Sequence, residues 1–439
     1  MLSEIDLSDT IFTANERLSN DAFDAAIQSV NHSILAEQLR RLRGTERKSD
    51  CSVNETRGEA PSVYKDAQRR FLQAVLAADA DTAEYLRVGY SGKYDSHYVN
   101  GIPGWIEYQA KEMATLEPWS IPTEDELDTH FPHVPLWGKR NEKLERRVRP
   151  FWVANRAKAH FSAAAAAIHF LGSIPAATRQ HLRRILVHED RMSVNSAAGH
   201  GRGLVPFCLE NPALRIERRV NLWRTCFLES TSEAFPHNPR LWLAHFVYVN
   251  DVEKMSAIHA DRITKPVAEW MVEASLLPEA ITLVLDGGPT PQHTSYIFQE
   301  VVQRDAAWQS AIELAFPPND SEPFQPYRNR DSEAYHFDGF PQLLHALSDN
   351  ERSSRVRCIN LDPGRPWSEE QINGIVEANR EYTHAFYWKE AWRRPGVLYR
   401  SVPLLPDVHS IKEEFVFPDG WIERYWEDES YGTGPPLML

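Results

Sequence analysis

Two short runs of strand-forming residues place the strongest constraint on the fold. Residues 184–190 read Arg-Ile-Leu-Val-His-Glu-Asp, and residues 280–286 read Ala-Ile-Thr-Leu-Val-Leu-Asp, followed by two glycines. Short apolar runs of this kind, without strict alternation, are typical of strands buried in a parallel sheet. A long helix is predicted soon after the second run, over residues 295–314. Both runs end in polar residues, at the edge where open α/β sheets place their sites.

The rest of the chain predicts helices on both sides of this sheet. The apolar spacing indicates helices over about 20–42, 64–79 and 162–171, and it also favours a helix over 216–227. Ser368 and Gln371 have the spacing of a capping box, which predicts a helix that continues through Trp392. The sequence therefore predicts an α/β fold with a Rossmann-like central sheet and helical N- and C-terminal additions.

We expect three regions along the 439 residues. Residues 1–62 hold an N-terminal helix and a mobile linker that is rich in Gly, Ser and Glu. Residues 63–316 form an α/β catalytic core, which includes a basic segment at 139–225. Residues 317–439 form a mainly helical C-terminal region.

Charge is distributed very unevenly. The basic segment 139–225 holds 17 lysines and arginines against six acidic residues, so it carries +11, while the whole chain carries −14. Arginines dominate it, and their planar guanidinium groups suit phosphates and carboxylates. The segment therefore provides either an RNA- or phosphate-binding surface, or arginines that pair with the acidic remainder of the chain. The overall negative charge excludes a generic nucleic-acid coat protein.

Several classes of protein lack support in the sequence. The four cysteines are scattered and form no CxxC pair, so we expect neither a disulfide framework nor a zinc site. No Walker lysine motif is present, and we expect no metal and no cofactor. The first residues have no basic region followed by an apolar one, and no apolar run is long enough for a membrane helix. We expect a soluble, cytoplasmic protein.

The first candidate site is the polar end of the first predicted strand. His188, Glu189 and Asp190 are candidate catalytic residues, because two carboxylates beside an imidazole can act as a general base and an orienting group. Neighbouring arginines could then hold an anionic substrate. Alternatively, the carboxylates pair with those arginines and cap the next turn. The spacing lacks the second histidine of an HExxH zinc motif.

Glycine-rich turns supply two further candidates. Asp286 and Gly287 form a possible substrate-binding turn, since glycine lets the backbone approach a ligand closely. The alternating glycines at 199, 201 and 203 form either a phosphate-binding or a mobile loop. Ser193 or Ser196 could accept an acyl group if His188 or Glu189 supplied the base, although no GxSxG motif surrounds either serine.

Two stretches in the middle of the chain resemble a known family. They read RILVHEDRMSV…GHGRGLVPFCLENPALRIERRVNLW and LVLDGGPTP…FQEVVQRDAAW. They are similar to the fungal arginine-containing cyclodipeptide synthases, ascomycete proteins that take arginine and a second amino acid from aminoacyl-tRNAs and close a diketopiperazine.

That resemblance implies partners and roles for particular residues. It implies arginyl-tRNA and a second aminoacyl-tRNA as partners, with no DNA and no membrane. Asp286, Gly287 and Ser193 would bind the substrate, and Glu189 or Asp190 could also hold its guanidinium group. The tRNA would bind to a set of arginines in the basic segment, namely Arg183, Arg184, Arg191, Arg202, Arg215, Arg218 and Arg219.

Two alternatives stay open at this point. One is an F-box-like interaction adaptor without catalysis, although residues 1–45 lack a convincing Leu-Pro-x-Glu opening. The other is a small-molecule tailoring enzyme, which would need the pocket and not the basic surface.

Overall fold

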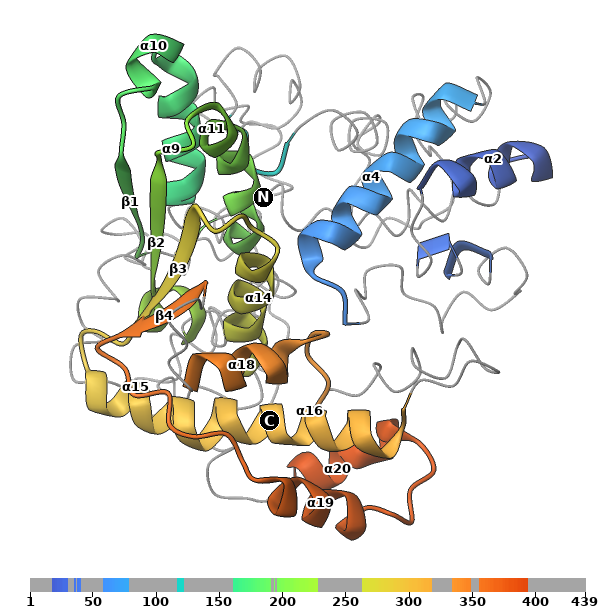
Figure 1. The fold of residues 1–439 in the computed structure, drawn as a ribbon. Helices are drawn as coiled ribbons and strands as arrows, with labels where there is room; N and C mark the ends of the chain where they lie inside the picture. The colour runs from blue at the N-terminus through green and yellow to red at the C-terminus, as the bar shows by residue number, and fades with distance from the viewer. Residues whose placement is uncertain are drawn as a thin grey trace, which may run out of the picture.

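The described residues form a four-stranded parallel sheet with helices packed against one of its faces. The computed structural model describes residues 18–30, 35–36, 38–40, 58–78, 117–121, 161–190, 193, 196–227, 263–317, 334–348 and 355–393. The strands are β1 (Arg184–Glu189), β2 (Arg215–Asn221), β3 (Ile281–Asp286) and β4 (Val356–Ile359). Figure 1 shows the sheet at one side of the molecule, with the helices gathered against it.

The strands follow one another across the sheet in chain order. Each neighbouring pair is parallel, with Ile185 opposite Ile216, Ile216 opposite Ile281 and Leu283 opposite Val356. Parallel neighbours need crossover connections, and the segments between these strands supply helices for them. The predicted α/β class is therefore confirmed. Among the described strands the order never reverses.

Helices precede β1 and connect each strand to the next. Before and between β1 and β2 lie α9 (Ala163–Ser173), α10 (Ala176–Arg179), the 3₁₀ helix η1 (Ala197–Leu204) and α11 (Val205–Glu210). Between β2 and β4 lie η2 (Leu222–Phe227), α14 (Thr264–Ser275), α15 (Pro291–Ile297), η4 (Phe298–Val302), α16 (Gln303–Ala315) and α18 (Phe340–Ser348). The predicted helix over 295–314 is thus confirmed, as part of a longer helix with a π-helical turn at η4.

The predicted helix over 216–227 is wrong in its first half. Residues there form β2, followed by the π-helical turn η2. Ile216, Arg218 and Val220 alternate with more exposed residues and face the helices, which is the period of a strand. The sequence does not reveal the alternation of this strand, because Arg218 is one of its buried residues and arginine is ordinarily exposed.

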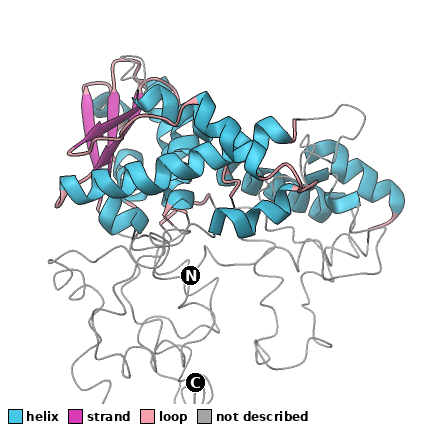
Figure 2. Ribbon diagram, turned by 90° about the horizontal axis from the view of Figure 1, so that it is seen from below, coloured by secondary structure: helices cyan, strands magenta, loops and turns pink. Residues whose placement is uncertain are grey.

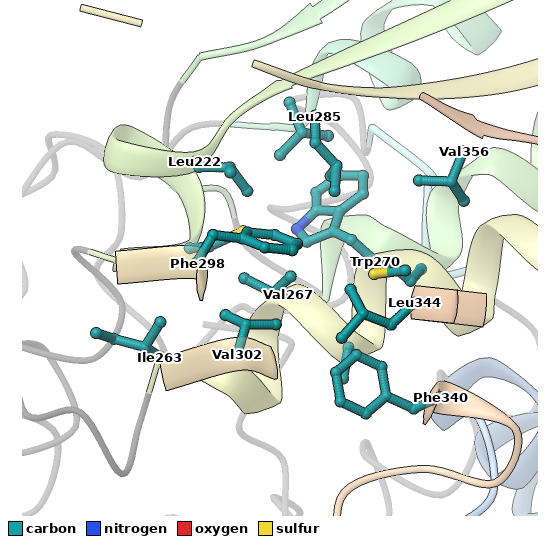
Figure 3. Packing of buried hydrophobic residues seen from close by; sticks show 14 of the residues in the cluster. Leu222, Ile263, Val267, Trp270, Leu285, Phe298, Val302, Phe340, Leu344 and Val356 are labelled. Atoms are coloured by element: carbon teal, nitrogen blue, oxygen red, sulfur yellow. The ribbon is translucent and has the colours of Figure 1, made fainter. Parts of the chain in front are cut away.

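The largest apolar core lies between the sheet and α14, η4 and α18. Figure 3 shows Trp270 and Val267 of α14 packed against Phe298, beneath Leu285 of β3. A second cluster continues the core under β1 and β2, with Val187 and Ile216 against α9 and α11. The strand residues in both clusters lie on one face of the sheet, and the described helices pack against that face.

The N-terminal helices have an apolar core of their own. α2 (Asn20–Val30) packs against α4 (Pro61–Ala78), with Phe23 and Ile27 buried beside Phe71 and Val75. Both helices lie apart from the sheet, on the far side of α14 (Figure 1). The predicted helices over 20–42 and 64–79 are therefore confirmed at these positions, while most of the predicted linker lies outside the described residues.

The described part of the C-terminal region contributes one strand as well as helices. β4 pairs with β3, and α19 (Glu369–Ala378) packs on α16. The capping box of Ser368 and Gln371 is confirmed, but the helix ends at Ala378, and η5 (Ala385–Tyr387) and α20 (Trp388–Arg393) follow separately. Figure 2 shows from below how the helices extend away from the sheet. In the described part of the chain, no helix combines the length and the apolar character that crossing a membrane requires.

Candidate functional site

Glu189 lies on the helix-covered face of the sheet and is almost completely buried. Its carboxylate accepts hydrogen bonds from the backbone N–H groups of Ala163 (2.8 Å) and Ala164 (3.2 Å), at the start of α9. The same carboxylate forms an ion pair with Arg218 of β2 at 2.8 Å. A carboxylate is favourable at a helix N-terminus, because the free N–H groups and the helix dipole attract it. These contacts give Glu189 a structural position, which is the second of the two alternatives that the sequence allows.

Arg218 is equally enclosed. It is 2% exposed, its guanidinium group donates to the carbonyl oxygens of Ala197 (2.8 Å) and Ala198 (3.0 Å), and it lies 4.7 Å from the ring centroid of Trp270. A tRNA backbone therefore has no access to Arg218 in this structure. Instead, the arginine joins β1, β2, η1 and α14 at one point.

The glycine-rich η1 is held tightly by its surroundings. Ser162, which caps α9 by accepting from the Ala165 N–H, lies 2.6 Å from Nδ1 of the buried His200. A β-carbon added at Gly201 would lie 2.7 Å from Nη1 of Arg218, and one at Gly203 would lie 2.7 Å from the Trp119 ring. The glycines are therefore required by close packing, which accounts for them without a bound phosphate.

A second charged group lies where α4 meets η1 and α14. The backbone N–H and hydroxyl of Ser62 both donate to the carboxylate of Glu273 (2.7 and 2.5 Å), and Arg202 donates to the same hydroxyl (3.2 Å). Beside them, the ammonium of Lys65 donates to Ser196 Oγ at 3.0 Å. These contacts connect the N-terminal helices to the sheet domain.

Burial shifts the pKa values of two groups at this junction. It lowers the pKa of the Lys65 ammonium, against the opposing attraction of Glu269 and Glu273. It raises the pKa of Glu269 to about 6, and Lys65 opposes this rise. Groups with perturbed pKa values and specific charged neighbours are concentrated at functional sites, although structural ion-pair networks produce them too.

The opposite face of the sheet, which we call the open face, carries a different set of side chains. His188 of β1 and Arg219 of β2 occupy paired positions on it, with Leu186 43% exposed one step further back. The arginines on this face come from three strands, at Arg184, Arg215, Arg219 and Arg357. Both faces of a parallel sheet are ordinarily covered by apolar packing. Among the described residues this face is lined by arginines and partly exposed, although Val284 of β3, opposite Arg219, is buried.

Glu217 lies among the arginines of the open face. Arg184 and Arg219 contact its carboxylate at 2.9 and 2.5 Å. Burial alone would raise the pKa of Glu217, but the hydrogen bonds from Arg219 and Arg184 outweigh this effect and lower it. One acidic residue is thus shared by two arginines, and the face retains an excess of positive charge.

Asp286 and Gly287 form a rigid turn at the carboxyl end of β3. Asp286 Oδ1 accepts from the Gly288 N–H (2.9 Å) and from Nδ2 of Asn360 (3.0 Å). A β-carbon at Gly287 would lie only 2.0 Å from the carbonyl oxygen of Asn360. The close approach that requires glycine here is therefore between two segments of the chain itself.

The remaining predicted residues are dispersed. Asp190 is exposed beyond β1, Ser193 is half-buried, and Arg183 is exposed before β1, where it donates to backbone carbonyls. Arg202 faces Ser62, away from the open face, and Arg191 lies outside the described residues. The structure thus brings His188, Arg184, Arg215 and Arg219 onto one face, and it separates Glu189, Arg218 and Arg202 from them.

Sequence reasoning missed three residues where α4 and α14 meet η1, and one arginine of the open face. Lys65, Glu273 and Trp270 have no motif around them, and only the packing of α4 and α14 brings them to η1. Arg357 was missed because β4 was not predicted. No group of three or more His, Cys, Asp and Glu residues in the described part of the chain could hold a metal ion. No protein-family model, curated protein or solved structure matches this chain.

Proposed function

We propose that the protein is a tRNA-dependent cyclodipeptide synthase, which joins arginine from arginyl-tRNA to a second amino acid from another aminoacyl-tRNA. The observation that supports this proposal best is the open face, where arginines from three strands lie on the same face as an exposed histidine. Arginine side chains on such a face suit the phosphates of an RNA backbone, and they would steer a polyanion toward His188.

The reaction needs a base but no activating nucleotide. The α-amine of one aminoacyl group attacks the ester carbonyl of the other, the bond to the tRNA 3′ oxygen breaks, and a proton passes from the amine to that oxygen. A second attack of the same kind closes the ring and releases the second tRNA. His188 would accept and return the proton, because imidazole is suited to proton transfer near neutral pH. Asp190 or Asp286 would hold the guanidinium of the arginyl group.

Three parts of the sequence-based interpretation enter this proposal in altered form. Glu189 and Arg218 act as positioning residues, because their side chains are occupied inside the fold. The tRNA-binding set is reduced to the arginines of the open face, together with Arg183. The four parallel strands would be the described portion of a Rossmann-like sheet.

The activity is tested by producing the chain alone in a microbial host and examining the extract by mass spectrometry. The host supplies all aminoacyl-tRNAs, so we expect a new ion with the mass of a cyclic dipeptide that contains arginine. His188→Ala should remove that ion while the purified protein keeps its circular dichroism spectrum. Well-expressed, folded protein that gives no such ion would contradict the proposed activity and would favour an adaptor role.

The open face is tested separately by measuring tRNA binding. We expect the double variant Arg184→Glu and Arg219→Glu to bind tRNA more weakly. The slope of log Kd against log salt should also fall, by about 1 for each phosphate that the variant no longer neutralises. Arg380→Glu is the matched control, because Arg380 is exposed on a different part of the fold, where it pairs with Glu377. Equal binding by the double variant and the control would exclude the open face as the RNA-binding surface.

A further inference from the structure

Two side chains that lie 131 positions apart in the sequence meet at the junction of α4 with η1. The Nζ atom of Lys65, in the second turn of α4, lies 3.0 Å from Oγ of Ser196, which directly precedes η1. Both residues are half-buried. This is the distance at which a base takes a proton from a serine hydroxyl, and lysine serves as that base in some serine nucleophile systems.

Ser196 is held in a backbone conformation that residues with a β-carbon rarely adopt. Its φ and ψ are 50° and 68°, in the left-handed region. Such conformations persist only where the surroundings enforce them, and they are concentrated at functional sites. Here the constraint comes from Arg218, which holds the carbonyls of the next two residues, and from the Gly199 N–H, which donates to the Ser196 carbonyl at 3.1 Å.

Lys65 is fixed from the other side. Ser62, one turn earlier in α4, is anchored through its N–H and hydroxyl to the buried carboxylate of Glu273. Both oxygens of Glu273 are thereby occupied, while Glu269 and Glu273 both attract the Lys65 ammonium. Burial lowers the pKa of Lys65 below its usual value, which increases the neutral fraction that can act as a base.

We propose that Ser196 is a nucleophile, that Lys65 is its general base, and that this pair forms an acyl-enzyme from carboxylic esters. In the first step Oγ bonds to the ester carbonyl carbon, and its proton passes to Nζ of Lys65. The bond from the carbonyl carbon to the leaving oxygen then breaks, and that oxygen takes the proton from Nζ. The acyl group stays on Ser196 until water or an amine displaces it by the reverse sequence of proton transfers.

This inference reaches beyond the proposed function, because it requires no RNA and uses residues on the helix-covered side of the sheet. The ester bond of an aminoacyl-tRNA belongs to the same chemical class as the small esters used in the test. A small ester and the extract experiment therefore give independent results, and failure of one does not decide the other.

The test treats the full chain with a fluorophosphonate probe, which traps activated serine hydroxyls, and with 4-nitrophenyl acetate. We expect a single adduct in the intact-protein mass spectrum, mapped to Ser196 after digestion, and a burst of nitrophenolate equal to the amount of protein. The rate of labelling should rise with pH and level off below the usual lysine pKa of about 10.4. Absence of an adduct on Ser196 in the folded wild-type protein would overturn the proposal.

Variants separate a chemical role from a structural one. Ser196→Gly removes the hydroxyl while relieving the left-handed backbone strain, so its loss of labelling cannot be attributed to unfolding. Lys65→Arg keeps the charge and a hydrogen-bond donor, but a guanidinium group does not act as a base at these pH values. We expect it to slow labelling by about 100-fold or more and to abolish the pH dependence. Ser173→Ala, at the exposed end of α9, is the matched control and should label like the wild type. Undiminished labelling in Lys65→Arg would exclude Lys65 as the base.

Discussion

Replacing Glu189 by alanine tests whether this residue acts in chemistry or in the fold. The substitution removes the acceptor of three hydrogen bonds, two from the start of α9 and one from Arg218. Only 3% of the Arg218 side chain and 1% of the Glu189 side chain are exposed, so water cannot replace the missing carboxylate. Breaking a buried ion pair from one side leaves an uncompensated charge and costs about 3–5 kcal/mol. We therefore expect Glu189→Ala to destabilise the protein by about that amount.

The measurement is urea unfolding followed by tryptophan fluorescence. Trp270 lies against the Arg218 guanidinium and reports on this part of the core. The midpoint should move to lower urea, and the melting temperature should fall by at least about 6 °C, since 1 kcal/mol corresponds to roughly 2–4 °C in a domain of this size. Glu189→Gln keeps an acceptor for the N–H groups, and we expect it to lose less stability than the alanine variant.

Asp190 provides the matched control for this experiment. It follows Glu189 directly and has the same chemistry, but its side chain is exposed. Asp190→Ala should change the free energy of unfolding by no more than about 0.5 kcal/mol. A double variant, Glu189→Leu with Arg218→Met, should be more stable than the sum of the single losses predicts, because neither charge is then left alone. Equal unfolding midpoints for Glu189→Ala and Asp190→Ala would refute the structural role.

Other predictions concern pH and close packing. Folding raises the pKa of Glu269 from 4.5 to about 6, so the folded protein binds this proton more tightly than the unfolded chain does. The free energy of unfolding should therefore fall as pH rises from 4.5 to about 6. Glu269→Gln should flatten this pH dependence in urea unfolding, and an unchanged profile would contradict the assignment. Lys65 has a lowered pKa, so its contribution should increase stability as pH rises through the alkaline range, and Lys65→Met should remove that increase in the same titration. Gly287→Ala should destabilise the protein by about 2 kcal/mol or more, because the new β-carbon would collide with the backbone of Asn360 where β3 meets β4. In Gly172→Ala, in α9, the new β-carbon meets nothing, and the variant should be more stable by about 0.5–1 kcal/mol. Similar melting temperatures for the two variants would contradict this prediction.

The buried pair also explains why a polar strand can lie within a parallel sheet. Arg218 occupies a core position of β2 where an aliphatic side chain would be expected. Its charge is met by Glu189, by two carbonyl groups and by the face of Trp270, while its Nε is buried without a hydrogen-bond acceptor among the described residues. Removing both charges can be nearly neutral for stability. We infer that the pair is valuable for fixing η1, and with it the position of Ser196.

The sequence by itself determined the elements whose signals are local. The apolar runs at 184–190 and 280–286 predicted β1 and β3, and the capping box at Ser368 predicted the start of α19. Such signals depend on neighbouring residues, because strand propensity and cap geometry act over a few positions. The same reasoning placed polar groups at the carboxyl end of β1, where His188 and Glu189 are found.

Only the tertiary structure decided which face each of those residues occupies and what it meets. Side chains alternate along a strand, so His188 and Glu189 lie on opposite faces of the sheet, but only the packing of α9 decides that Glu189 takes the covered face. The sequence predicts a helix in place of β2. Arg218 is a core residue of that strand only because its partners come from η1, α14 and β1, and a local sequence pattern does not contain them. The contact between Lys65 and Ser196 depends on how α4 docks on the sheet domain, and no local pattern encodes a contact of that range.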